Sequence, residues 1–178
     1  MQASIRSAAQ ALTCLAMWTV AASSAAAATP PPLLKQENVS LALANELIGA
    51  TLAACHADGR SAVVVVVDRG GNLLAVQRDD SVGPHNTQAA QRKAYTALST
   101  KTPTRQLAAN ARANPDAQNL NTVESLLLIG GGVPLFSGKE VIGAIGVGGA
   151  GGASHDEGCA LKAIAQVLSP SPENQVSN

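Results

Sequence analysis

Aromatic side chains are almost absent from this sequence. Its 178 residues include one Trp, one Tyr and one Phe. Trp18 falls within the first 28 residues, so the rest of the chain keeps only Tyr95 and Phe136. A folded core must therefore be built from Val, Ile, Leu and Ala, whose small side chains favour close packing of helices on a sheet.

An excess of charge of either sign is absent as well. The chain has 12 Lys and Arg residues against 12 Asp and Glu residues. Arg6 is the only charged residue among the first 28, which leaves 11 bases and 12 acids in the remainder. No basic patch is visible, and this argues against nucleic acid and anionic membrane surfaces as partners.

Cysteine is scarce, with three in the whole chain. Cys14 lies in the N-terminal segment, and Cys55 and Cys159 remain after it. An even number of cysteines in an oxidising compartment favours a disulfide. Two half-buried thiols on helices are the alternative, because the sequence does not give the Cα separation that a disulfide requires.

Residues 1–28 have the three parts of a secretory signal peptide. Arg6 supplies the positive charge, residues 8–22 form the apolar centre, and small residues lead to an A-x-A-like site that ends at Ala28. We expect cleavage there and a periplasmic or secreted protein without a stable membrane anchor. An uncleaved anchor is the alternative, although the apolar run is short for a membrane span.

We expect a proline-rich leader at residues 29–37, a folded domain at 38–168 and a disordered tail at 169–178. Helical spacing predicts a first helix that Ser40 caps and Gly59 ends. Five consecutive valines at residues 63–67 predict a buried strand. The turn at residues 68–72 should lead into a second strand at 73–78, forming a hairpin.

Three further helices are predicted. The first covers residues 86–99, and the second runs to Arg112 with Thr102 as cap and Pro103 at the first helical position. The third covers 154–168, where Ser154 and Glu157 match a capping box. Residues 126–157 hold 10 of the 16 glycines and predict three short strands, at about 126–129, 133–136 and 140–145. The fold class expected is α/β of the α+β type, a mostly antiparallel sheet of about five strands packed with helices.

The glycines from Gly146 to Gly151 match G-x-G-x-x-G, but no later strand carries the acid that a dinucleotide-binding fold requires. A narrower hypothesis survives, in which backbone N–H groups at a helix N-terminus bind a carboxylate or phosphate. A tight structural turn is the alternative. Ser154, His155 and Asp156 are adjacent, so they cannot form a catalytic triad.

Lys93 and His85 are the side chains most suggestive of a site. Lys93 lies on an alanine-rich helical face, where its ammonium either reaches solvent or pairs with an acid or a ligand carboxylate. His85 follows Gly83 and Pro84 in a predicted loop. No pair of histidines has metal-site spacing, yet a single axial ligand to a haem iron needs only one residue.

Two blocks of the sequence resemble one family. The block HNTQAAQRKAYTALSTKTPT (residues 85–104) and the block GGVPLFSGKEVIGAIGVGGAGGASHD (residues 131–156) are similar to the GlcG/HbpS family of DUF336-type haem-binding proteins. With the hairpin at Asp68 and Gly71, the resemblance covers most of residues 38–168. It implies an antiparallel sheet domain, a homo-oligomer, haem binding in some members, and an association with glycolate or diol metabolism in others.

The resemblance also implies a ligand cleft. The residues that would line it are Lys93, Thr104, Gly131, Gly132, Gly148 and Gly149, and His85 and Thr104 are candidate ligands of a haem iron. Gly148 stands where a serine is common, which removes a hydroxyl contact. Because aromatic residues are scarce, a shallow or interfacial haem site is expected rather than a deep one.

Three functions follow as hypotheses. The leading one is an exported haem-binding or tetrapyrrole-binding protein for scavenging, storage or sensing, and not an enzyme. The second is an enzyme that degrades haem or acts on a small carboxylate, although no paired carboxylates or activated nucleophile support it. The third is a non-catalytic oligomeric module that binds a protein partner.

Overall fold

The computed structural model describes residues 31–168. The chain divides into two units, and in the first of them (Met1–Leu34) the described residues 31–34 have no regular secondary structure. The account below concerns the second unit, from Lys35 onward. The predicted signal peptide, the first residues of the predicted leader and the predicted disordered tail lie outside the described residues.

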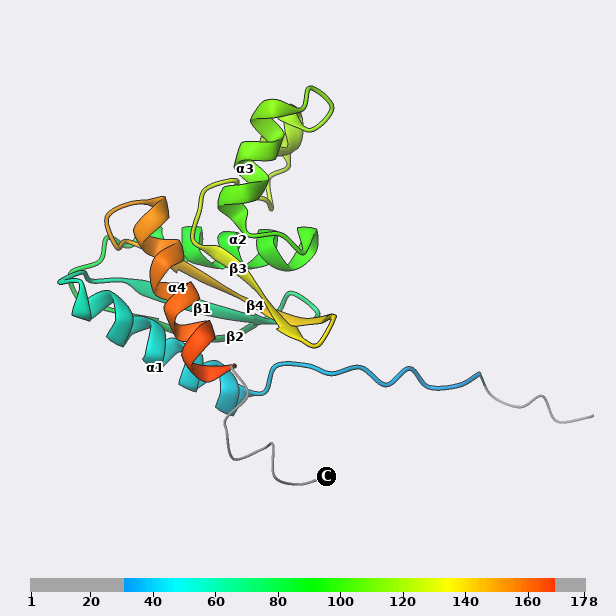
Figure 1. Cartoon of the computed structure of the whole chain (residues 1–178), viewed down its shortest axis with the longest axis horizontal. Helices are drawn as coiled ribbons and strands as arrows, with labels where there is room; N and C mark the ends of the chain where they lie inside the picture. The colour runs from blue at the N-terminus through cyan, green and yellow to red at the C-terminus, as the bar shows by residue number, and fades with distance from the viewer. Residues whose placement is uncertain (1–30, 169–178) are drawn as a thin grey trace, which may run out of the picture. The chain divides into compact units, whose positions relative to one another are not determined.

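A four-stranded antiparallel sheet forms the centre of the second unit, in the order β2-β1-β4-β3. Helices α1 and α4 cover one face and α2 covers the other, whereas α3 extends away from the sheet (Figure 1). The predicted fold class is confirmed, with four strands rather than about five. The elements are α1 (Leu41–Ala57), β1 (Val63–Asp68), β2 (Leu73–Arg78), α2 (His85–Thr100), α3 (Thr104–Ala113), the 3₁₀ helix η1 (Gln118–Thr122), β3 (Gly132–Ser137), β4 (Glu140–Gly148) and α4 (Ala153–Val167).

The run of five valines is explained by helices on both faces of β1. Val64 and Val66 belong to the core formed with α1 and α4, whereas Val63, Val65 and Val67 belong to the core formed with α2. A strand that is buried on both faces needs apolar residues at every position rather than in alternation.

The strand predicted at residues 126–129 is wrong. The segment is apolar, but its backbone groups bond to helix side chains instead of a neighbouring strand. The Leu127 amide donates to Thr96 Oγ1 at 2.8 Å, and Arg92 Nη2 donates to the Leu126 carbonyl at 2.6 Å. The Ile129 carbonyl accepts a hydrogen bond from Thr104 Oγ1 at 2.7 Å. These contacts bind the segment to α2 and α3 and leave no ladder for a fifth strand.

Helix α2 packs unusually close to the sheet because glycines lie beneath it. A Cβ atom at Gly146 would overlap the Ala90 carbonyl oxygen and lie 2.7 Å from the Ala94 amide nitrogen. A Cβ atom at Gly132 would collide with the Lys93 carbonyl. The helix presents Ala90 and Ala94, each fully buried, at this contact. Glycines on the sheet and alanines on the helix thus let the two backbones pack closely without large side chains between them.

One of the three predicted helix caps is confirmed. Ser40 caps α1, since its hydroxyl accepts a hydrogen bond from the Leu43 amide at 3.2 Å. Thr102 does not cap α3, because its hydroxyl donates back to the Thr100 carbonyl at 2.9 Å and Pro103 precedes the helix. Gly152 precedes α4 and makes no side-chain cap, so the capping box at Ser154 is also wrong.

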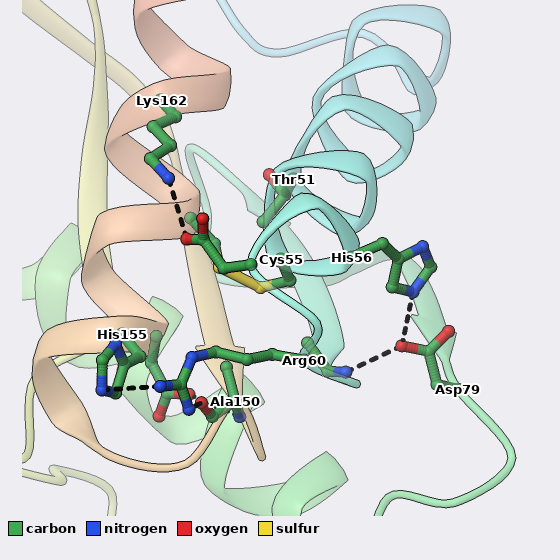
Figure 2. Close-up of a disulfide and its surroundings, with 12 residues drawn as sticks. Thr51, Cys55, His56, Arg60, Asp79, Ala150, His155 and Lys162 are labelled. Atoms are coloured by element: carbon green, nitrogen blue, oxygen red, sulfur yellow. Dashed lines mark hydrogen bonds and ion pairs between the residues drawn. A yellow bond between two sulfur atoms is a disulfide. The ribbon is translucent and has the colours of Figure 1, made fainter.

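A disulfide joins α1 to α4 (Figure 2). Cys55 and Cys159 are 104 residues apart in sequence, and their Cα atoms lie 5.3 Å apart in the structure. Both residues are buried in the core between the two helices. Of the two alternatives that the sequence leaves open, the structure therefore has the disulfide.

We predict that Gly146→Ala destabilises the protein by about 1–3 kcal/mol, because the added methyl group forces α2 away from the sheet. Gly158→Ala is the matched control. It adds the same methyl group inside α4, where nothing lies within 4 Å, and it should stabilise the helix by about 1 kcal/mol. Urea unfolding of both variants measures the difference, and equal midpoints would contradict the close packing of α2.

We predict that replacing both Cys55 and Cys159 by Ala lowers the free energy of unfolding by roughly 3–5 kcal/mol, because a cross-link over about 100 residues restricts the unfolded chain. Urea unfolding measures the loss. The wild-type protein with and without reductant is the control, and its reduced form should approach the double variant. Mass spectrometry that finds two free thiols in the oxidised protein would count against the bond.

Candidate functional site at the end of the sheet

A buried ion pair lies where β4 ends and α4 begins. Lys93 extends from α2, and its Nζ donates to Asp156 Oδ2 at 2.7 Å and to the Val147 carbonyl at 2.9 Å. Both side chains of the pair are 5% exposed. The second oxygen of Asp156 accepts a hydrogen bond from the Ala150 amide at 2.8 Å. One carboxylate therefore connects α2, the end of β4 and the glycine loop.

Thr104 and two glycines complete this cluster. The buried Thr104 hydroxyl accepts a hydrogen bond from the Gly132 amide at 2.9 Å, which fixes the start of β3. Gly131 has a φ of 119°, and a Cβ atom there would lie 2.6 Å from the Val147 carbonyl oxygen and 3.1 Å from Lys93 Nζ. Only glycine leaves room for the lysine at this position. Lys93, Thr104, Gly131 and Gly132 are thus brought together, and internal contacts engage their polar groups.

The other predicted site residues lie around the first turn of α2. Gly148 is buried beneath the Asn86 carbonyl oxygen, which a Cβ atom would approach to 3.2 Å. Gly149 is exposed and has a φ of 88°. His85 is the first residue of α2 and its side chain is exposed. The structure therefore divides the seven predicted residues into a buried group at the sheet end and a second group at the start of α2.

A second ion pair borders the buried one. Arg105 Nε donates to Glu157 Oε2 at 2.7 Å, and the Glu157 side chain is 8% exposed whereas that of Arg105 is 61% exposed. Both residues line a cavity of about 300 Å³ at the start of α3. Sequence reasoning assigned Glu157 to a helix cap and gave Arg105 no role. No local signal pairs them, because they are 52 residues apart.

The outer side of α2 carries a polar stripe. His85, Gln88 and Arg92 follow one another at the i, i+3 and i+7 positions of the helix, so they share one face. Gln88 and Arg92 line a groove of about 570 Å³ together with Val123, Glu124 and Ser125. Sequence reasoning missed Arg92 and this segment, although the helical spacing from His85 could have revealed the stripe.

Arg92 is held in the groove by one of its nitrogens. Its Nη2 donates to the Leu126 carbonyl at 2.6 Å. Its Nε is buried and has no hydrogen-bond partner among residues 31–168. A buried donor without a partner is costly in a folded protein.

Polar contacts near the disulfide hold the glycine loop from its other side. Figure 2 shows Arg60 beside Ala150 of the loop, and its Nη1 donates to the Ala150 carbonyl at 2.8 Å. The other terminal nitrogen lies 3.0 Å from His155 Nε2. Sequence reasoning left His155 unexplained, and this contact with an arginine 95 residues away gives it a structural role.

Asp79 forms a separate contact with the end of α1. Its carboxylate lies 2.9 Å from His56 Nε2 and accepts a hydrogen bond from the Ala62 amide at 2.8 Å. Burial raises the pKa of Asp79. The contacts with the Ala62 amide and the His56 ring together lower it by more, so the pKa lies below its ordinary value.

Within residues 31–168, no three His, Cys, Asp or Glu side chains are grouped so that they could hold a metal ion. Over the same range, every helix falls short of the length and apolar character needed to cross a membrane.

The fold is a single-sheet α+β domain with helices on both faces, and the buried pair of Lys93 and Asp156 lies at one end of the sheet. This chain belongs to the HbpS-like family, whose profile carries the description "Haem degrading protein HbpS-like" and matches residues 39–165. The resemblance to the GlcG/HbpS family is thereby confirmed.

Similar proteins share both sequence and fold with the chain. Protein GlcG of Escherichia coli K12 is 31% identical over 109 residues, which cover 61% of this chain and 80% of GlcG. A double mutant of HbpS from Streptomyces reticuli superposes with a TM-score of 0.72 at 34% identity, over 82% of this chain and 98% of HbpS. A PduOC:haem complex gives a TM-score of 0.64 at 26% identity, over 72% and 94% of the two chains.

We predict that Lys93→Met and Asp156→Asn each destabilise the protein by about 3–5 kcal/mol, because each change leaves a buried charge without its partner. The double variant Lys93→Met/Asp156→Asn should lose less than the sum of the single losses. Urea unfolding of all four proteins gives the coupling energy.

Lys162→Gln is the control for the loss of one positive charge. Lys162 pairs with Asp58 at the surface, 2.8 Å away, and its side chain is 57% exposed. Its replacement should change the midpoint little. A Lys93 variant as stable as the Lys162 variant would show that the buried pair is unimportant for folding.

Proposed function

We propose that this protein is exported and binds haem or a related tetrapyrrole, for scavenging, storage or sensing. The family description and the PduOC:haem complex support the ligand. The pattern of residues 1–28 supports export. The groove on the outer side of α2 is the proposed binding site.

The placement of Arg92 in the groove is the observation that carries the proposal. Its guanidinium lines a groove of about 570 Å³, a volume within the roughly 300–1,000 Å³ typical of small-molecule sites. A carboxylate in the groove is a suitable acceptor for this guanidinium, whose buried Nε lacks a partner among the described residues. Haem carries two propionates, and one of them would give Arg92 the acceptor that it lacks.

The other residues along the groove fit the rest of a tetrapyrrole. His85 lies one turn before Gln88 on the same face of α2, and its exposed imidazole is a common axial ligand of haem iron. The Val123 side chain, 45% exposed, offers an apolar contact to the ring. Bound haem would supply the iron chemistry, and the chain would supply the cation, the imidazole and the apolar contact.

The ligand-lining role expected of Lys93, Thr104 and the four glycines stays a prediction. Lys93 is 4% exposed and Thr104 is fully buried, and both polar groups are engaged within the protein. We propose that these two residues act on the ligand indirectly, by fixing α2 and the start of β3. Arg92 and His85 would then make the direct contacts.

A hemin titration of the purified protein, followed in the Soret region, tests the proposal. We expect a saturable band for the wild type, a changed or lost band for His85→Ala, and affinity about tenfold weaker for Arg92→Gln because a charged hydrogen bond is lost. Lys162→Gln, which removes a charge on the opposite layer of helices, is the control and should bind as the wild type does.

The outcomes of the titration distinguish between the candidate functions. Absence of a saturable band in the wild type would exclude haem binding and favour the small-carboxylate or partner-binding alternatives. A saturable band followed by a biliverdin-like product after addition of reductant would favour the haem-degrading enzyme, which the family description also suggests. Unchanged spectra for His85→Ala would remove His85 as the iron ligand without removing the site.

A further inference from the structure

A second cavity lies at the opposite end of β4 from the Lys93–Asp156 pair. Its volume is about 280 Å³, and it is formed where the β1–β2 turn, the end of α2 and the β3–β4 turn meet. The cations that line it are Arg69, Lys101 and Lys139, and Glu140 is the single acid. We call this site the basic cavity. It shares no lining residue with the groove at Arg92.

The single acid of the basic cavity is already neutralised. Arg69 Nη2 donates to Glu140 Oε2 at 3.0 Å, and Arg69 Nη1 donates to the Val141 carbonyl at 2.9 Å. The side chains of Lys101 and Lys139 form no ion pair or hydrogen bond within residues 31–168. Two positive charges therefore remain uncompensated at the cavity.

The backbone of Lys101 is an independent sign of function. Its φ is 52°, which makes it the one non-glycine residue with positive φ in the described part of the chain. It ends α2, where its amide bonds to the Leu98 carbonyl at 3.3 Å. Glycine or asparagine is favoured at such a position, since other residues are strained there. A strained lysine that lines a cavity suggests that its side chain is needed.

The cavity also has an apolar wall. Tyr95 and Leu98 line it from α2. The Tyr95 ring is held against the β1–β2 turn, since a Cβ atom at Gly71 would lie 2.9 Å from Tyr95 Cε2. Tyr95 is one of the two aromatic residues outside residues 1–28, and it is 37% exposed. An apolar wall beside two cations suits a ligand that has both a carbon skeleton and negative charge.

We propose that the basic cavity binds a small organic dianion, either a dicarboxylate or a phosphate monoester. Lys101 and Lys139 would each pair with negative charge on the ligand. Tyr95 and Leu98 would contact its carbon skeleton. The site is separate from the proposed haem groove, so the protein would hold two ligands of different chemistry.

Calorimetric titration of the full chain at low salt, with succinate and with phenyl phosphate as probes, tests the site. We expect saturable binding of at least one probe, and the preferred probe distinguishes dicarboxylate from phosphate monoester. Lys139→Gln should weaken that binding about tenfold, and raised salt should weaken it further because the contacts are between charges. Lys162→Gln removes an equal charge elsewhere and should bind as the wild type does.

The variant Lys101→Gly tests whether the Lys101 side chain is needed for ligand binding or for folding. Glycine suits the backbone at this position, so the variant should fold with an unchanged or higher thermal midpoint. The proposal expects the same variant to lose about tenfold in affinity. Unchanged affinity in both Lys101→Gly and Lys139→Gln, or no saturable heat from either probe in the wild type, would overturn the proposal.

Discussion

The buried pair of Lys93 and Asp156 is the constraint on which the rest of the domain depends. The sheet separates α2 from α4, and this pair connects the two layers around the end of β4. Neither charge can remain buried without the other. The contact in turn requires Gly131, which leaves room for the ammonium, and Gly132, which leaves room for the Lys93 carbonyl. The glycines and the ion pair are therefore parts of one arrangement.

The same region of α4 is fixed to its other neighbour by a covalent bond. Cys159 follows Asp156 by one helical turn and is bonded to Cys55 of α1. Asp156 thus ties α4 to α2 in the opposite layer, and Cys159 ties it to α1 in its own layer. Between the two ties, Arg60 bonds to the glycine loop at Ala150. A loop of flexible residues is thereby held in one conformation by contacts on both sides.

Sequence patterns predicted the elements whose causes are local. The valine run, the Ser40 cap and the hairpin turn each depend on residues within a few positions of one another. The fifth strand was wrong because Thr96 and Thr104 bind the backbone of the apolar segment at residues 126–129, and nothing local reveals such partners. The same reason explains why Asp156 could not be chosen as the partner of Lys93, 63 residues away. The resemblance to the family rested on the two sequence blocks at residues 85–104 and 131–156. These blocks include the residues at the sheet end, but they do not include Val123 of the groove.

Helix α2 links the structural and functional parts of the molecule. Ala90 and Ala94 pack on the sheet, Lys93 reaches the sheet end, and Arg92 lines the proposed haem groove. In a shallow site, affinity depends on charged groups that are already in place, because ordering them on binding would cost free energy. The ion pair and the glycine contacts fix the position of α2 on the sheet. A Lys93 variant that loses both stability and haem binding would therefore indicate a displaced α2. Loss of binding would point to Lys93 itself only in a variant that keeps its stability.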